Sequence, residues 1–156
     1  MFVAAAPHPS ARLAWLLPLS YALHILEEWF GGFRDWIALF VGSPLPATAF
    51  IVINAIAMAA MIAATWASTT RAGYGWAGIA VATVLVVNAL AHTFGTLVTS
   101  RYSPGLVTAL LLYLPLAGLV LLRASSRAER GAFRTGVVAG FAIHALVFVV
   151  AFLSAR

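Results

Sequence analysis

The chain of 156 residues contains no cysteine, which excludes disulfide bonds, thiolate metal ligands and a cysteine nucleophile. Lysine is absent as well, so that all nine basic residues are arginines. Only 8% of the residues are charged, whereas a soluble domain carries about 25%. Because 63% of the residues are hydrophobic, this scarcity of charge indicates an integral membrane protein.

Several stretches of the chain lack charged residues over lengths that can cross a bilayer, which takes about 20 apolar residues. Together with the apolar run near the N-terminus, they predict an all-α, polytopic membrane helix bundle. We expect a single transmembrane domain over residues 1–156 with about five transmembrane helices. Their approximate bounds are 12–31, 46–67, 76–99, 104–123 and 134–154.

The arginines separate the apolar runs, which is typical of membrane topology and not of nucleic-acid binding. Since cytoplasmic loops carry the excess of positive charge, the more basic side predicts a cytoplasmic N-terminus in the inner membrane. The bilayer is thus the expected partner, nucleic acid is not, and an oligomer stays open. The more basic side would hold Arg12, Arg71, Arg123, Arg127, Arg130 and Arg134, and the other side Arg34, Arg101 and Arg156.

Small residues at four-residue spacing mark faces where helices can pack closely. Gly136 and Gly140 form such a pair in the last predicted helix. A longer row stands in the second predicted helix. We expect both to pack within one bundle, in preference to forming a dimer interface. The longer row comprises Ala55, Ala59, Ala63 and Ala67.

Two adjacent carboxylates, Glu27 and Glu28, stand near the end of the first apolar run, in a chain with only four acidic residues. His24 precedes Glu27 by three residues and Glu28 by four, so that in a helix it lies on the same side as both carboxylates. Ionisable groups at membrane depth are costly and usually mark function. These three residues, together with His92 in the third predicted helix, are therefore the candidate catalytic residues.

Further polar residues occur at similar membrane depth in the other predicted helices. Asn88 lies four residues before His92, His144 lies in the last helix, and Asn54 lies in the second. Under the predicted topology they fall in one layer between the membrane centre and the outer leaflet, which predicts one shared site. The candidates for orienting a substrate are Asn88, Asn54, Tyr21 and Tyr113.

Imidazole and carboxylate groups suit two kinds of chemistry. They are good ligands for Zn, Fe or Mn, and helix bundles build metal sites from inward-facing Glu and His. Without a metal, two neighbouring carboxylates resist double ionisation, so that one keeps a proton and can act with a histidine as a general acid/base pair. The hypothetical metal ligands are His24, Glu27, Glu28, His92 and His144.

Purely structural interpretations stand beside these. Glu28 can reach the membrane interface or pair with Arg34, and His144 can be a neutral core histidine. Tyr113 stands close to Pro115, which predicts a helix kink. The remaining polar residues can simply hydrogen bond between helices; these are Asn54, Asn88 and His92.

The motif His24-Ile-Leu-Glu27-Glu28, followed by the run 29–33, resembles the HXXEE domain family of small bacterial membrane proteins. The Asn88 and His92 pair and the segment 101–116 are similar to its other recurring blocks. The resemblance extends from about Leu13 to Phe152. It implies a bacterial integral membrane protein and supplies no reaction.

Three classes of function are compatible with these residues. The first is an intramembrane enzyme, metal-dependent or acid/base, acting on a lipophilic small molecule as a hydrolase, lyase or isomerase. The second is a proton-linked transporter or channel subunit that uses the Glu and His residues as a relay. The third is a structural accessory membrane subunit.

Overall fold

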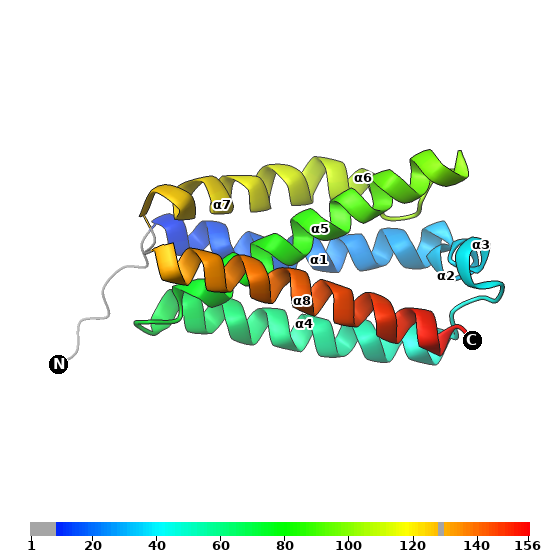
Figure 1. Ribbon diagram of the computed structural model, residues 1–156, viewed down its shortest axis with the longest axis horizontal. Coiled ribbons are helices and arrows are strands. Elements are labelled where there is room, and N and C mark those ends of the chain that lie inside the picture. The colour runs from blue at the N-terminus through cyan, green and yellow to red at the C-terminus, as the bar shows by residue number, and fades with distance from the viewer. Residues whose placement is uncertain (1–8, 128–129) are drawn as a thin grey trace.

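The computed structural model describes residues 9–127 and 130–156, which form an antiparallel bundle of helices (Figure 1). The first half consists of α1 (Pro9–Gly31), the short helices α2 (Phe33–Trp36) and α3 (Ala38–Val41), α4 (Ala47–Thr70) and α5 (Gly75–Thr99). The second half consists of α6 (Leu106–Thr108), the π-helical turn η1 (Ala109–Tyr113), α7 (Leu114–Arg127) and α8 (Arg130–Ser154). The all-α prediction is confirmed for the described residues.

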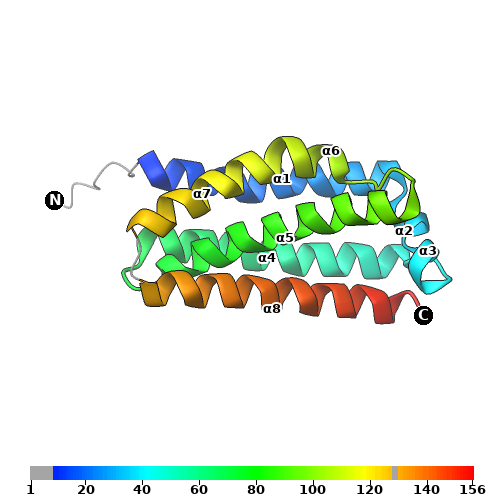
Figure 2. The same cartoon turned by 45° about the horizontal axis from the view of Figure 1, so that its top comes forward.

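Four helices in the described part of the chain are long and apolar enough to cross a membrane. They are α4, α5, the continuous rod of α6, η1 and α7, and α8. The predicted number of about five is wrong because α1 falls outside this group. With 23 residues α1 has the length, but Arg12, His24 and the two glutamates make it less apolar. It still runs alongside the others for the length of the bundle (Figures 1 and 2).

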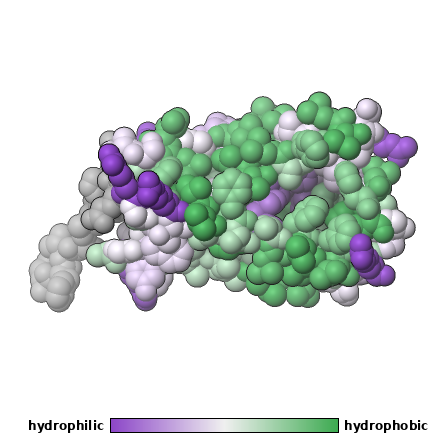
Figure 3. All heavy atoms as spheres, viewed as in Figure 1, coloured by the Kyte–Doolittle hydropathy of each residue, from purple (hydrophilic) through white to green (hydrophobic). Residues whose placement is uncertain are grey.

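Helix α5 forms the centre of the bundle (Figure 2). Half of its most apolar window is buried, whereas only 11% is buried in α4 and in α8. The outer helices therefore turn most of their apolar side chains outward, and the face in Figure 3 is predominantly hydrophobic. Such a surface is stable in a bilayer and unfavourable in water, which supports an integral membrane protein.

The closest helix packing joins α5 to α8 at the two glycines of the predicted GxxxG motif. A methyl group on Gly136 would lie 2.6 Å from the Ile79 side chain, and one on Gly140 would lie 2.5 Å from that of Thr83. The predicted packing role of this motif is confirmed. The alanine row of α4 differs from the prediction, because Ala55, Ala59 and Ala63 are exposed on the outside of the bundle.

The rod that begins at Leu106 is irregular just before Pro115. Proline has no N–H to donate to the carbonyl four residues earlier, and the π-helical turn η1 precedes it directly. The predicted distortion is thus present, as a π turn. Such turns occur frequently at functional sites. Here the turn ends at Tyr113, whose side chain is fully buried.

The arginines gather at the two ends of the bundle as the sequence predicts. The starts of α1 and α8 and the ends of α4 and α7 lie at one end, and the ends of α1, α5 and α8 lie at the other (Figure 1). The end that contains Arg12, Arg71 and Arg123 is the more basic one. Which side of the membrane it faces stays a prediction.

Candidate functional site

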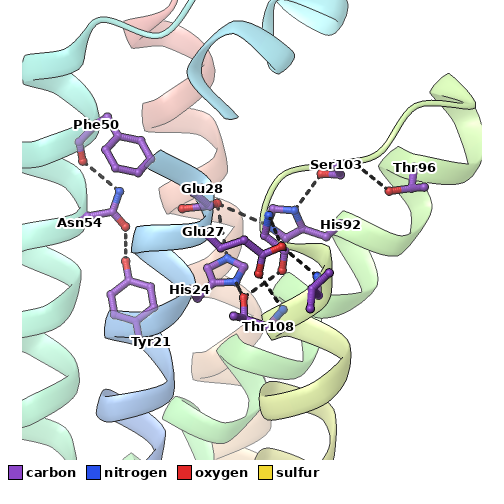
Figure 4. A network of polar contacts seen from close by, with 12 residues as sticks. Tyr21, His24, Glu27, Glu28, Phe50, Asn54, His92, Thr96, Ser103 and Thr108 are labelled. Carbon is purple, nitrogen blue, oxygen red and sulfur yellow. Dashed lines mark hydrogen bonds and ion pairs between the residues drawn. The ribbon is translucent and has the colours of Figure 1, made fainter. Parts of the chain in front are cut away.

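Three buried side chains from two helices converge in the half of the bundle nearer its less basic end. His24 and Glu28 lie one helical turn apart on α1, and His92 projects from α5 (Figure 4). Their exposed fractions are 1%, 6% and 4%. Glu28 Oε1 lies 3.4 Å from Nε2 of His24 and 3.4 Å from Nε2 of His92. One carboxylate oxygen therefore faces both imidazoles.

Each imidazole is held on its other nitrogen by a hydroxyl group. His24 Nδ1 lies 2.9 Å from Oγ1 of Thr108, and His92 Nδ1 lies 2.8 Å from Oγ of Ser103. Ser103 lies in the segment that joins α5 to the following rod, and Thr108 lies in the first turn of that rod. These contacts fix the ring orientations, in the way that outer-shell partners orient metal-binding histidines.

The two contacts of the Thr108 hydroxyl favour one tautomer of His24. A hydroxyl has one proton to donate, and that of Thr108 is directed to the carbonyl oxygen of Gly105 at 3.2 Å. With its proton in that bond, Thr108 Oγ1 accepts from Nδ1–H of His24. In this tautomer Nε2, a buried atom without a hydrogen-bond partner, carries a lone pair.

The cluster offers side-chain donors of the kinds that divalent metal ions bind. N–H···O bonds usually measure about 2.7–3.2 Å, and both contacts to Glu28 exceed this at 3.4 Å. Ligands at about 2.0–2.1 Å from a tetrahedral ion lie roughly 3.4 Å apart. One ligand atom from each of His24, Glu28 and His92 lies within 4.8 Å of the other two. The three residues can therefore hold a divalent metal ion.

The loop between α5 and α6 closes the site on one side. A methyl group on Gly105 would lie 2.7 Å from Cε1 of His24 and 2.7 Å from Cε1 of His92. Gly105 also has a φ of 105°, in the region that favours glycine. Ser103 is fully buried, and its N–H donates to Oγ1 of Thr96 at 3.1 Å. Glycine is thus required where the loop backbone meets the two imidazoles.

Tyr113 forms the wall behind His24. The ring centroids of the two residues lie 4.6 Å apart. The Tyr113 hydroxyl is buried and has no hydrogen-bond partner. It does not line the cavity that Glu28 and the two histidines reach, so the structure places Tyr113 as a packing partner of the imidazole.

Glu27 is directed away from the histidine pair. Its Oε1 accepts hydrogen bonds from the N–H groups of Gly105 and Val107 at 3.1 and 3.0 Å and from the Tyr102 hydroxyl. Its Oε2 accepts from the N–H of Thr108 at 2.7 Å. A carboxylate is stabilising at a helix N-terminus, where N–H groups lack partners within the helix. Glu27 thereby fixes the start of the rod that contains Thr108.

A cavity of about 340 Å³ opens beside the cluster. It lies among α1, the α2–α3 segment, α4, α5 and α8, and most of its lining residues are apolar. His24, Glu28 and His92 reach it from one wall. The other predicted site residues that line it are Tyr21, Asn54, Asn88 and His144.

The remaining polar residues of the cavity differ in how they are engaged. The Tyr21 hydroxyl donates to Oδ1 of Asn54 at 2.6 Å, and Nδ2 of Asn54 donates to the Phe50 carbonyl at 2.9 Å. Asn54 therefore joins α4 to α1 through Tyr21 and is also bound to the backbone of its own helix. Asn88 Oδ1 and Trp36 Nε1 are buried without partners, so they are the polar atoms available to a ligand.

The structure thus brings most predicted site residues to one cavity from four helices, and it separates others. His24, Glu28 and His92 meet at metal-ligand spacing. His144 lines the cavity without joining that group, and Glu27 faces the loop. The suggested pairing with Arg34 is not seen among the described residues, because the Arg34 side chain donates to the Leu45 carbonyl.

Sequence reasoning missed several residues of the site. Ser103, Gly105 and Thr108 were not among the candidate residues, although they contact both imidazoles. Trp36 was not a candidate either, and it packs against Gly95 beside the cavity. The glycine and serine in the turn 102–105 were the available indication, but their distance to the motif depends on the tertiary fold.

Comparison with known proteins assigns the chain to a family and to no activity. No curated protein matches the chain, and no solved structure does. The family model described as "Protein of unknown function with HXXEE motif" matches residues 15–120, which is more than half of the sequence. His24, Glu27 and Glu28 provide that motif, and the chain belongs to the HXXEE family.

Proposed function

We propose that this protein is a metal-dependent enzyme of the membrane interior that acts on a lipophilic small molecule. The observation that carries the proposal is the meeting of His24, Glu28 and His92 at ligand spacing beside a largely apolar cavity. Two histidines and one glutamate form a known catalytic zinc set, which leaves a fourth position for water or substrate. The donors also suit Fe or Mn.

The hydroxyl partners support this use of the imidazoles. Thr108 is placed to hold His24 in the tautomer with a free Nε2 lone pair, which is the form that binds a metal. Ser103 is placed to do the same for His92. A buried carboxylate facing a buried lone pair is unfavourable by itself, and a cation between them removes the repulsion.

The cavity supports a small, largely apolar substrate. Its volume of about 340 Å³ stands near the lower limit of ligand pockets, which span roughly 300–1,000 Å³. Its aromatic and aliphatic walls exclude bulk water, and Asn88 and Trp36 offer one acceptor and one donor to orient a polar group. A substrate with an apolar body and one polar, reactive bond fits this distribution.

Hydrolysis is the reaction that uses this set most directly. A bound divalent ion supplies Lewis acidity and lowers the pKa of a coordinated water. The side chains of His24 and His92 would hold the ion, and Glu28 would offset its charge. Of the sequence-based alternatives, metal-free acid/base catalysis uses the same Glu28 and histidines, and metal analysis separates the two. The expected location is the bacterial inner membrane, with the more basic end in the cytoplasm.

The test is elemental analysis of protein purified in detergent and reconstituted separately with Zn²⁺, Fe²⁺ and Mn²⁺. We expect close to one ion per chain, lost in His24→Ala and His92→Ala and retained in the control His144→Ala. Hydrolysis of p-nitrophenyl decanoate in the same samples should follow the metal content. Absence of metal in every reconstituted sample would overturn the metal site, and metal loss in His144→Ala would contradict the assigned ligands.

A further inference from the structure

A groove on the outer surface between α5 and α8 adjoins the cavity. The groove is lined by residues 87–94 of α5 and 141–149 of α8 and is almost entirely apolar. Four residues belong to both the groove and the cavity. The two spaces therefore adjoin at these side chains, which are Ala91, Phe94, His144 and Phe148.

The four shared residues are suited to a passage. The side chains of Phe94 and Phe148 are 67% and 57% exposed, so neither is held firmly by packing. Ala91 leaves room between them, since its side chain is a single methyl group. Figure 3 shows hydrophilic residues at the bottom of a hollow in the otherwise hydrophobic face between α5 and α8. The polar wall of the cavity is thus reachable from this face.

The surroundings of this opening determine what can enter. Both helices that flank it are apolar and long enough to cross a membrane, so the groove faces lipid hydrocarbon. The passage contains no charged residue, and His144 is its single polar side chain. A water-soluble or charged molecule would lose its hydration there without compensation. A molecule that is already dissolved in the bilayer loses nothing.

We infer that the substrate reaches the site sideways from the bilayer, between Phe94 of α5 and Phe148 of α8, as an uncharged, single-chain amphiphile. The polar end enters first and meets Glu28 and the histidines, while the apolar part stays in the cavity and the groove. This inference rests on the proposed function for the identity of the reactive end. The entrance itself follows from the cavity, the groove and their shared residues.

The route can be tested by photolabelling in phosphatidylcholine vesicles. The probe is a decanol analogue that carries a diazirine near the hydroxyl group and partitions into the bilayer. In the wild-type protein we expect labels on cavity residues such as Asn88 and Ile53, located by mass spectrometry. Ala91→Trp fills the passage and should reduce this labelling at least fivefold. Phe148→Ala widens the passage and should increase it.

Ala142→Trp is the matched control, because Ala142 is exposed on α8 but lines neither the groove nor the cavity. It should leave cavity labelling unchanged. Unlabelled cavity residues in the wild type, or equal labelling in Ala91→Trp and Phe148→Ala, would overturn the entrance. The metal content of the same samples keeps the two proposals apart. If the protein contains no metal but its labelling changes with the passage variants, the entrance is supported and the metal enzyme is refuted. If the protein contains metal but its labelling does not change with these variants, the metal site is supported and the entrance is refuted.

Discussion

The carboxylates of Glu27 and Glu28 are neighbours in the sequence and bind different parts of the molecule. Glu28 Oε1 faces Nε2 of His24 and of His92 at 3.4 Å. Glu27 receives the backbone N–H groups at the start of the following rod. About 100° of helical rotation separates successive residues, which is enough to send one side chain to the ligand cluster and the other to the loop. The two acidic residues of the motif therefore have separate roles.

This division predicts opposite effects for two matched substitutions. Glu28→Gln should abolish stoichiometric metal binding and leave the thermal midpoint in detergent close to that of the metal-free wild type. Glu27→Gln should retain the metal ligands but lose an acceptor for the N–H groups of the rod. Leaving such N–H groups unpaired lowers the free energy of unfolding by about 1–3 kcal/mol. For a chain of this size this lowers the thermal midpoint by a few degrees. Equal metal loss in both variants, at equal stability, would contradict the division.

Much of the fold could be predicted from hydropathy, because a bilayer helix depends on local composition. The bounds of α4, α5, α8 and the intervening rod follow the uncharged runs within a few residues. The packing of Gly136 and Gly140 follows from a local motif as well. The number of apolar helices was overestimated, since the polar residues of α1 that build the site also lower its hydropathy.

The site could be predicted only in part, for a geometric reason. Helical spacing places His24 and Glu28 on one face, and matching membrane depth brought His92 into the same layer. Which glutamate faces His92 depends on the rotation of α1 against α5, which spacing along one helix does not specify. The roles of Ser103 and Gly105 depend on how the loop folds back onto α1, and no local pattern encodes this.

Tyr102 predicts a pH dependence of stability at alkaline pH. The pKa of Tyr102 is raised from 10.0 to about 12. The largest cause is burial, followed by the hydrogen bond to the Glu27 carboxylate and by the negative charge of that carboxylate. A raised pKa in the folded state stabilises the fold below pH 10, and this contribution is lost as the pH rises from 10 towards 12. Thermal midpoints of the wild type and of Tyr102→Phe should therefore converge over this range. Tyr74→Phe, in the loop before α5, is the control and should follow the wild type. Parallel curves for the wild type and Tyr102→Phe would count against the contact with Glu27.

Gly105 predicts a steric effect on both imidazoles at once. A methyl group at this position would approach Cε1 of His24 and of His92 to 2.7 Å, closer than side-chain carbons tolerate. Gly105→Ala should therefore displace the rings and weaken metal binding by at least tenfold, measured by competition with a chelator. Gly118→Ala is the control, because nothing lies within 4 Å of the added methyl group in α7. Alanine is favoured over glycine in a helix interior by about 1 kcal/mol, so this control should match or exceed wild-type stability. Unchanged metal affinity in Gly105→Ala would mean that the loop does not press on the histidines.

Removing the hydroxyl of Ser103 or Thr108 should weaken metal binding although all three metal ligands remain. Each holds the Nδ1 of one imidazole, at 2.8 and 2.9 Å, and so fixes the orientation and tautomer of a metal-binding ring. Removing such a partner typically lowers metal affinity by about 10–100-fold. Thr108→Val keeps the shape of the side chain and removes the hydroxyl, whereas Thr108→Ser keeps the hydroxyl and removes the methyl group. We expect Thr108→Val and Ser103→Ala to bind zinc more weakly by this factor, and Thr108→Ser to bind it like the wild type. If Thr108→Ser weakened binding as much as Thr108→Val, packing and not the hydrogen bond would hold the ring.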